Sequence, residues 1–546
     1  MQAVSDNWKK THNRTLLNES YVELSMNIAN PEVLAAAVSQ DNGKIYISDS
    51  SKLVKGTSET LVPYCTLEQN IWCLDGNQKA IPESDYGDNG FVGDALSDDT
   101  CIFSAKKPTI TITFNELPYI SGLPGITINW SKTYGEFADS FAIKAYWANT
   151  EVSKKEVTGN RSVVSLILWE PGICDRLEIV VEKWCLPNHR ARVEEIYVGI
   201  NKVYGKSELF QYTHTQSVNP VSTSLPKMEI KFSIDNSDGE YDPYNKNGLS
   251  KYLDEQQEIK ARYGLKMDDG SIEWIKAGTF YLSEWYAKQN GLTADFTARD
   301  IFEFMSAIYY DSITEIKERS LYDLATSVLQ SAGIPLNRDG TVKWSIDDSL
   351  KTIYTTAPLP EDSLANCLQL IAHAGRCVMY QDREGILQIK SLRDEEHSGY
   401  PPLYYMDYTI SSFSSYSDPE LTLSKPIKQI NTMIYTYTIV DNKIESTKEK
   451  SVRSVNLNGE TITMDNPLVT NSSMAGDIAE WITKNDSSFR KLLDFSWRPD
   501  VRLDALDLIV NLRGDFVMDT VRMTEIDLSY NGSFRGKGKG VVMYNG

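Results

Sequence analysis

Alternation of apolar and polar residues over 221–305 is the feature that most constrains how this chain folds. Four apolar residues occupy every second position there, which is the period of a strand with one buried face. They are Met228, Ile230, Phe232 and Ile234. Turn-forming residues at 235–243 end this strand, and Asp-Asp-Gly-Ser at 268–271 indicates a hairpin connection. Several short antiparallel strands of this kind predict a small barrel or sandwich.

A second β-rich stretch begins near residue 107. Six strand-like runs without helical period lie at 109–114, 125–130, 141–147, 163–169, 177–181 and 193–200. Their regular spacing predicts a β-sandwich. Two earlier runs, 21–28 and 44–48, also have the character of strands, and 31–39 is either a short helix or a loop. We expect both early strands to pair with the barrel that resumes after residue 200, which makes the sandwich an insertion.

Helical spacing appears in the middle of the chain. Residues 320–332 carry apolar side chains at i, i+3, i+4, i+7 and i+8, with Ser320 as N-cap and Gly333 as a stop signal. Residues 363–374 repeat this pattern, and a hairpin follows at 377–389, so an α+β domain is predicted. The pattern then returns to strands at 404–437 and 508–529, with an exposed hairpin at 442–459 and a short helix at 474–483.

Several of these segments resemble prophage-encoded tail proteins of Firmicutes, which are similar to the hub proteins of contractile tails. The resemblance covers Ile-Asp-Asn-Ser-Asp-Gly-Glu-Tyr-Asp-Pro at 234–243, Gly-Thr-Phe-Tyr-Leu at 278–282, Thr-Ala-Arg-Asp-Ile at 297–301, 320–389 and the ending 530–540. It implies two tube-like hub β-barrels around an α/β domain, in a mainly β chain with α+β. In that family three subunits form a ring that matches the sixfold tail tube.

The resemblance implies a structural role in a virion tail, assembled in the cytoplasm of the host bacterium. The expected partners are further copies of the chain in a homotrimer, the tail tube and distal tail proteins, and a central spike or tape-measure protein. The expected domains are an N-terminal segment with first barrel strands, a linker, the sandwich, the first barrel, the α+β domain and the second barrel. Their bounds are 1–60, 61–105, 106–202, 203–310, 311–398 and 399–546.

The predicted sandwich is similar to galactose-binding-like jelly rolls, which in tail proteins are thought to contact glycans. Aromatic residues crowd it, and such residues more often form the core than a sugar site. Tyr134 and Phe137 lie in a predicted loop, so these two are the candidates for exposed glycan contacts. A glycan-binding receptor-recognition protein is therefore the alternative to a hub, and a cell-wall glycosidase or peptidase is a third class.

No motif singles out catalytic residues, metal ligands or a cofactor site. The glycine- and lysine-rich run at 532–540 lacks phosphate-loop spacing, and a flexible basic strand end is the better interpretation. A calcium loop centred on Gly239 would place Ile234 and Asn245 at ligand positions that need a carboxylate, so turns closed by Asp and Asn side chains are expected instead. The five histidines have no zinc-protease spacing: His12, His189, His214, His373 and His397. A cation at His373 would suit the end of the predicted helix.

The net charge, the length and the cysteine spacing of the chain each argue against certain classes of protein. The net charge of −20 argues against specific nucleic-acid binding, and it fits either ordinary solubility or a ring whose wall repels DNA. The 546 residues are too many for one core. We expect no signal peptide and no membrane span. The seven cysteines have irregular spacing and predict free thiols rather than disulfides: Cys65, Cys73, Cys101, Cys174, Cys185, Cys367 and Cys377.

Overall fold

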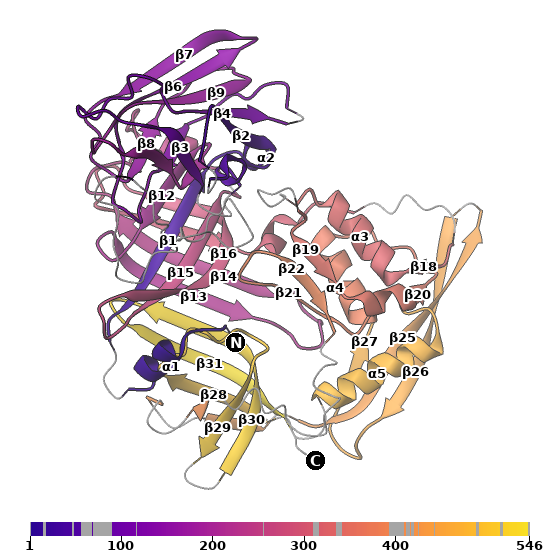
Figure 1. Cartoon of the computed structure of the whole chain (residues 1–546). Coiled ribbons are helices and arrows are strands. Elements are labelled where there is room, and N and C mark those ends of the chain that lie inside the picture. Colours follow the sequence, from indigo (N-terminus) through magenta and orange to yellow (C-terminus); the bar gives the residue numbers. More distant parts are fainter. Residues whose placement is uncertain are drawn as a thin grey trace. The chain divides into compact units, whose positions relative to one another are not determined.

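The computed structural model describes most of the chain. The described residues are 2–14, 18–45, 48–55, 68, 90–115, 117–254, 256–309, 316–334, 341–391, 409–410, 415–416, 420–423, 425–441, 443–486, 491–513 and 517–543. The chain divides into two compact units, Met1–Ser25 with Val203–Ile334 and Lys343–Gly546, and Met26–Lys202 with Pro335–Val342. Each unit is mainly β, as the sequence predicts (Figure 1).

One 13-stranded sheet dominates the first unit, in the order β12-β1-β15-β16-β17-β14-β13-β30-β31-β28-β24, and β29 pairs with both β30 and β23. Its strands are β1 (Ser20–Ile28), β12 (Ile200–Tyr204), β13 (Leu209–Ser217), β14 (Lys227–Asp235), β15 (Glu258–Lys266), β16 (Ile272–Ala287), β17 (Thr293–Arg299), β23 (Thr409–Ile410), β24 (Glu420–Leu423), β28 (Lys491–Trp497), β29 (Leu508–Arg513), β30 (Val517–Tyr530) and β31 (Phe534–Met543). The boundary between the units falls within β1 and β12.

The pairing of β13 with β30 makes this sheet continuous. It aligns Tyr212 with Tyr530 and Ser217 with Glu525, so two β-rich regions about 300 residues apart share one sheet. The sequence pattern predicts the strands of both regions but not this pairing. The expected pairing of 21–28 with the barrel is confirmed, because β1 lies beside β15.

The C-terminal run corrects one expectation. Residues 532–540 are not a flexible end, because β31 lies between β28 and β30 and pairs with both. Three glycines face the inner side of β31, and a Cβ at Gly538 would lie only 2.7 Å from the ring of Phe495. The glycines therefore let aromatic side chains of β28 lie directly over the strand. This close approach is the structural reason for the glycine-rich run.

The α+β part of the first unit has its own apolar core. The helices α3 and α4 pack against each other and against a three-stranded sheet β19-β22-β21 (Figure 1). The elements are η3 (Ile301–Phe304), β18 (Arg319–Ser320), α3 (Leu321–Ser331), β19 (Trp344–Ile346), η4 (Asp348–Thr352), β20 (Tyr354–Thr355), α4 (Leu364–Ala374), β21 (Val378–Gln381) and β22 (Leu387–Lys390). Both predicted helices are confirmed, and the Ser320 hydroxyl accepts a bond from the Asp323 N–H at 3.0 Å.

His373 at the end of α4 differs from the expected cation. Its side chain is buried, and Asn466 Nδ2 lies 3.1 Å from His373 Nδ1. Burial lowers the pKa of His373 to about 4. The imidazole is therefore neutral at pH 7, because desolvation outweighs the favourable helix dipole.

The remaining elements of the first unit include an exposed hairpin that begins earlier in the chain than the predicted 442–459. Its strands β25 and β26 pair Gln429–Val440 with Lys443–Ser454, and α5 contacts this sheet. The bounds are α1 (Asp6–His12), η2 (Ser250–Tyr252), β25 (Ile427–Val440), β26 (Lys443–Ser454), β27 (Glu460–Met464) and α5 (Ser472–Asp486). No helix within the described ranges is long and apolar enough to cross a bilayer.

The second unit contains sheets of five, three and two strands, in the orders β2-β4-β9-β6-β7, β11-β5-β8 and β10-β3. Its elements are α2 (Pro31–Ala36), β2 (Ala37–Asp41), η1 (Ser50–Lys52), β3 (Phe91–Leu96), β4 (Thr109–Phe114), β5 (Gly125–Asn129), β6 (Ala138–Trp147), β7 (Thr150–Val157), β8 (Val164–Leu168), β9 (Arg176–Trp184), β10 (Arg190–Val193) and β11 (Glu195–Tyr197). Within its core, the ring of Trp130 contacts the rings of both Phe141 and Trp184.

Three details of the second unit differ from expectation. Lys44 forms a bridge with Gly93 of this unit instead of pairing with the barrel, and residues 46–47 lie outside the described residues. The run 193–200 is divided among β10, β11 and β12. Strand β7 was not predicted, because its side chains are almost all exposed and give no apolar alternation.

Candidate functional site

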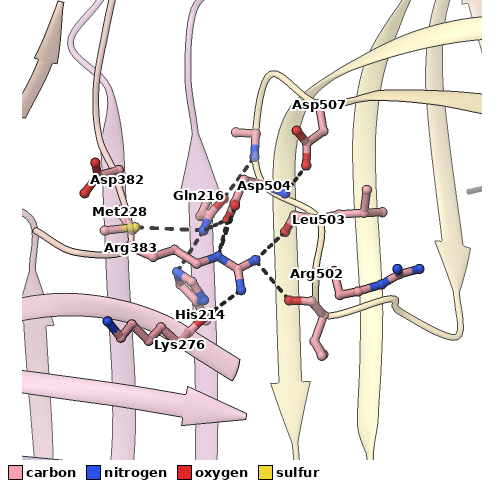
Figure 2. A network of polar contacts seen from close by, with 12 residues as sticks. His214, Gln216, Met228, Lys276, Asp382, Arg383, Arg502, Leu503, Asp504 and Asp507 are labelled. Carbon is pink, nitrogen blue, oxygen red and sulfur yellow. Dashed lines mark hydrogen bonds and ion pairs between the residues drawn. The ribbon is translucent and has the colours of Figure 1, made fainter. Parts of the chain in front are cut away.

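A buried polar junction joins the α+β part of the first unit to both halves of the large sheet (Figure 2). Its centre is Arg383, which lies in the turn between β21 and β22. The Asp382 carboxylate holds this turn by accepting bonds from the N–H groups of Glu384 and Ile386 at 3.0 and 2.9 Å. Gly385 completes the turn with φ +81°, a conformation that favours glycine. The turn therefore presents Arg383 in a fixed position.

The Arg383 guanidinium uses all three of its nitrogens. Nε donates to the two oxygens of Asp504 at 2.8 and 3.0 Å, and Nη1 donates to the Lys276 carbonyl at 2.7 Å. Nη2 donates to the carbonyls of Val501 and Leu503, both at 3.0 Å. One side chain thus holds β16 and the loop that leads into β29 (Figure 2). Such a planar fork matches several acceptors at once.

Asp504 also bonds to the central strand of the sheet. Gln216 on β13 donates to Asp504 Oδ1 at 3.2 Å and accepts from the Ala505 N–H at 3.0 Å. Burial acts to raise the pKa of Asp504, but the charge and hydrogen bonds of Arg383 and the bond from Gln216 outweigh it. The pKa of Asp504 is therefore lowered, and the carboxylate is charged at neutral pH.

The junction continues into the core beneath the sheet. His214 Nδ1 lies 2.7 Å from the Tyr263 hydroxyl, which lies 3.0 Å from the Tyr212 hydroxyl. Burial lowers the pKa of His214 to about 3, and the charge of Arg383 acts in the same direction. The imidazole is neutral and serves as a hydrogen-bonding group inside the core. These buried hydrogen bonds stabilise the core of the first unit.

This junction is not predictable from the sequence pattern. The only available signals were the Asp-Arg-Glu-Gly turn at 382–385 and the Asp-Ala-Leu-Asp run at 504–507, and both are typical of exposed loops. Their contact depends on the pairing of sheet regions that are distant in the sequence. A single sequence does not reveal that pairing.

The outer face of the large sheet is charged over many strands. Along one row of cross-strand neighbours lie Glu420, Asp494, Lys539 and Glu525. The next row contains Ser496, Lys537, Asp527, Thr215, Glu229 and Arg299. Ion pairs connect Lys539 with Glu525 at 2.6 Å and Arg299 with Glu229 at 2.9 Å. We call this surface the charged sheet face.

A hollow of about 270 Å³ lies on the charged sheet face. Its lining includes four carboxylates and two amines, from Glu420, Asp494, Glu525, Asp527, Lys537 and Lys539. Within the described part of the chain, no cluster of three or more His, Cys, Asp or Glu side chains is placed to hold a metal ion. The lining of the hollow thus carries side chains of both signs.

The two candidate glycan contacts lie close together at the start of β6, and both side chains are half-buried. The Arg192 guanidinium carbon lies over the ring of Tyr134, 5.0 Å from the centroid of that ring. Phe137 packs against the core of the second unit, and its N–H donates to Cys185 Sγ at 3.3 Å. Glu136 between them is buried and accepts from Trp184 Nε1 at 2.8 Å. Both rings are therefore partly engaged with the protein.

Two other predictions about side chains are confirmed. In the 235–243 loop, the carboxylates of Asp235 and Asp238 accept bonds from the N–H groups of Ser237 and Glu240 at 2.9 and 3.0 Å. The described cysteines are free thiols: Cys101, Cys174, Cys185, Cys367 and Cys377. Cys65, Cys73 and His397 lie outside the described residues, as does nearly all of 61–89.

Comparison with protein-family models gives no match. No curated protein matches the sequence either. The solved structures with similarity to the chain include phage tail proteins. One is the prophage MuSo2 43 kDa tail protein of Shewanella oneidensis, with 12% identity over 63% of this chain and 96% of that chain and a TM-score of 0.39.

Two further solved structures show similarity of the same order. The tail protein of Neisseria meningitidis MC58 has 9% identity over 73% of this chain and 96% of that chain, with a TM-score of 0.39. Prophage tail protein gp18 of Listeria monocytogenes EGD-e has 8% identity over 62% and 91%, with a TM-score of 0.37. These identities and TM-scores are low, so the function proposed next rests on the residues of this chain.

Proposed function

We propose that the chain is a structural, non-catalytic component of a phage or phage-like tail tip. Three copies form a ring at the end of the tail tube and hold the receptor-binding or puncturing apparatus. The observation that carries this proposal is the continuous sheet, in which regions near 210 and 530 pair and a buried junction holds the α+β part against them. The family-like segments at 221–310, 320–390 and 521–540 lie in this unit.

The proposed role of each region follows the domains expected from the sequence. The regions 203–310 and 399–546 provide the tube-like barrels, and 311–398 joins them. The charged sheet face suits a surface that stays hydrated within a ring, because it carries ion pairs between neighbouring strands. The partners of the ring are the tail tube, distal tail proteins, and a central spike or tape-measure protein, in a virion tail.

Mass measurement in solution, followed by mixing with tail tubes, tests this proposal. We expect a trimer that binds the end of the tube. A strict monomer that fails to join tail tubes would contradict the proposal. A charge-reversed variant of the charged sheet face, Asp527→Lys, serves as a probe of whether that surface is needed for the ring.

A second candidate function is glycan recognition through the second unit. Tyr134 and Phe137 are the contacts proposed from the sequence, and their half-buried rings leave part of each surface accessible. Loss of binding to a glycan array after Tyr134→Ala or Phe137→Ala would support these two residues. This function is compatible with the hub role, because it uses a different unit of the chain.

A further inference from the structure

Two exposed aromatic rings meet at the other end of β6 from Tyr134 and Phe137. Tyr119 and Trp147 have ring centroids 5.8 Å apart and an interplanar angle of 83°. Their exposed fractions are 49% and 39%, whereas Trp130 and Trp184 in the same unit are fully buried. An exposed tryptophan at a perpendicular angle to an exposed tyrosine forms an open aromatic corner. We call this pair the aromatic corner.

The backbone holds the aromatic corner rigidly. Trp147 precedes the two-residue turn between β6 and β7, in which Ala148 and Asn149 have φ of 47° and 64°. The Ala148 N–H donates to Asp175 Oδ2 at 2.8 Å. On the other side, Ile120, the neighbour of Tyr119, exchanges two backbone bonds with Cys174 at 2.8 and 3.1 Å. Binding here would therefore need little ordering of the protein.

Polar groups adjoin the aromatic corner. Asn149 accepts from Arg176 Nη1 at 3.0 Å through Oδ1, which leaves its Nδ2 as a donor. Asp175 uses Oδ2 for the turn, and its Oδ1 accepts no hydrogen bond from the described residues. A donor and an acceptor thus lie next to two accessible ring surfaces. Apolar ring faces with a few fixed polar groups suit a ligand that has both C–H surfaces and hydroxyl groups.

We propose that the aromatic corner is a saccharide-binding site, with a pyranose ring stacked on Trp147 or Tyr119. The hydroxyl groups of the sugar would bond to Asn149 Nδ2 and Asp175 Oδ1. This inference rests on the second candidate function and assigns it to a different pair of rings. A purely apolar protein partner fits less well, because it would leave the adjacent donor and acceptor without bonds.

The test uses the full chain on an array of hexopyranose oligosaccharides, followed by calorimetric titration of the sugar with the strongest signal. We expect Trp147→Ala and Tyr119→Ala each to weaken binding about tenfold, which is the order of an aromatic stacking contact. Trp147→Phe keeps a ring and should restore most of the affinity. Tyr286→Ala removes a ring of the first unit that is more exposed than either ring of the aromatic corner, and it should leave the affinity unchanged.

Three results would overturn the proposal: no binding to any hexopyranose, binding unaffected by both alanine substitutions, and binding weakened only by Tyr134→Ala or Phe137→Ala. Trp147 lies on the surface, so its substitution should leave the thermal unfolding midpoint of the chain unchanged. The oligomeric mass of each variant is measured in parallel. A chain that assembles normally but binds no sugar contradicts this site and leaves the hub proposal intact.

Discussion

Replacing Arg383 by methionine tests whether the buried junction holds the two halves of the large sheet together. Methionine keeps much of the side-chain volume but removes every donor, so the Asp504 carboxylate loses its ion pair and three carbonyls lose a bond. Breaking a buried ion pair from one side costs about 3–5 kcal/mol. The Asp504 side chain is 27% exposed, and water will screen part of its charge. We therefore expect about 3 kcal/mol.

Native-state hydrogen exchange measures this loss of stability in the strands that the junction joins. The chain has two units, so global unfolding is not a two-state process, whereas exchange reports the local stability of each segment. A loss of 3 kcal/mol corresponds to roughly 100-fold faster exchange of β13 and β30 amides. The matched control is Lys276→Met, which removes an exposed ion pair with Glu384 and should cost less than about 1 kcal/mol.

Two outcomes show whether Arg383 stabilises the sheet and whether it does so together with Asp504. Arg383→Met protein that exchanges as slowly as the Lys276→Met control would refute the role assigned to the junction. The double substitution Arg383→Met with Asp504→Leu removes both charges, so it should be more stable than Arg383→Met alone. A purely additive double variant would show that the two side chains are not coupled.

Three further predictions concern stability. Gly538→Ala should destabilise the second β region by about 1–3 kcal/mol through crowding against its aromatic neighbours, and thermal unfolding compared with Lys537→Ala checks this. The folded-state pKa values of His214 and His373 lie below the unfolded value, so only the unfolded chain binds these protons below about pH 6.5. The free energy of unfolding should therefore fall as the pH drops from about 6.5 toward 4. Replacing either histidine, by His214→Gln or His373→Gln, should reduce the slope of that free energy against pH by about 1.4 kcal/mol per pH unit. A variant with the same slope as the original protein would contradict a buried neutral imidazole. Ser320→Ala should cost about 1 kcal/mol in α3 stability, measured by exchange of its first-turn amides.

Local patterns predicted most of the elements of this fold. The spacing of apolar residues located α3 and α4 and most of the strands, because one buried face is visible in the sequence itself. Ser320 marked the start of its helix for the same reason, since capping is a local interaction. Strand β7 gave no such signal because it lies exposed at a sheet edge.

Long-range relations were not predictable in the same way. The contact of Arg383 with Asp504 depends on a strand pairing across about 300 residues. The aromatic corner at Tyr119 and Trp147 likewise forms where a loop meets the end of β6, and the sequence favoured a different pair of rings. His373 was expected to be charged, and only its burial shows that it is neutral. The sequence determines these features through tertiary packing, which a local pattern does not display.

The central claim is that the continuous sheet belongs to a subunit of a closed ring at a tail tip. Analytical ultracentrifugation of the purified chain, alone and with isolated tail tubes, tests this claim most directly. The proposal predicts a trimeric mass and co-sedimentation with the tubes, with one ring at the tube end in electron micrographs. A monomer over the whole concentration range that never sediments with tubes would contradict it.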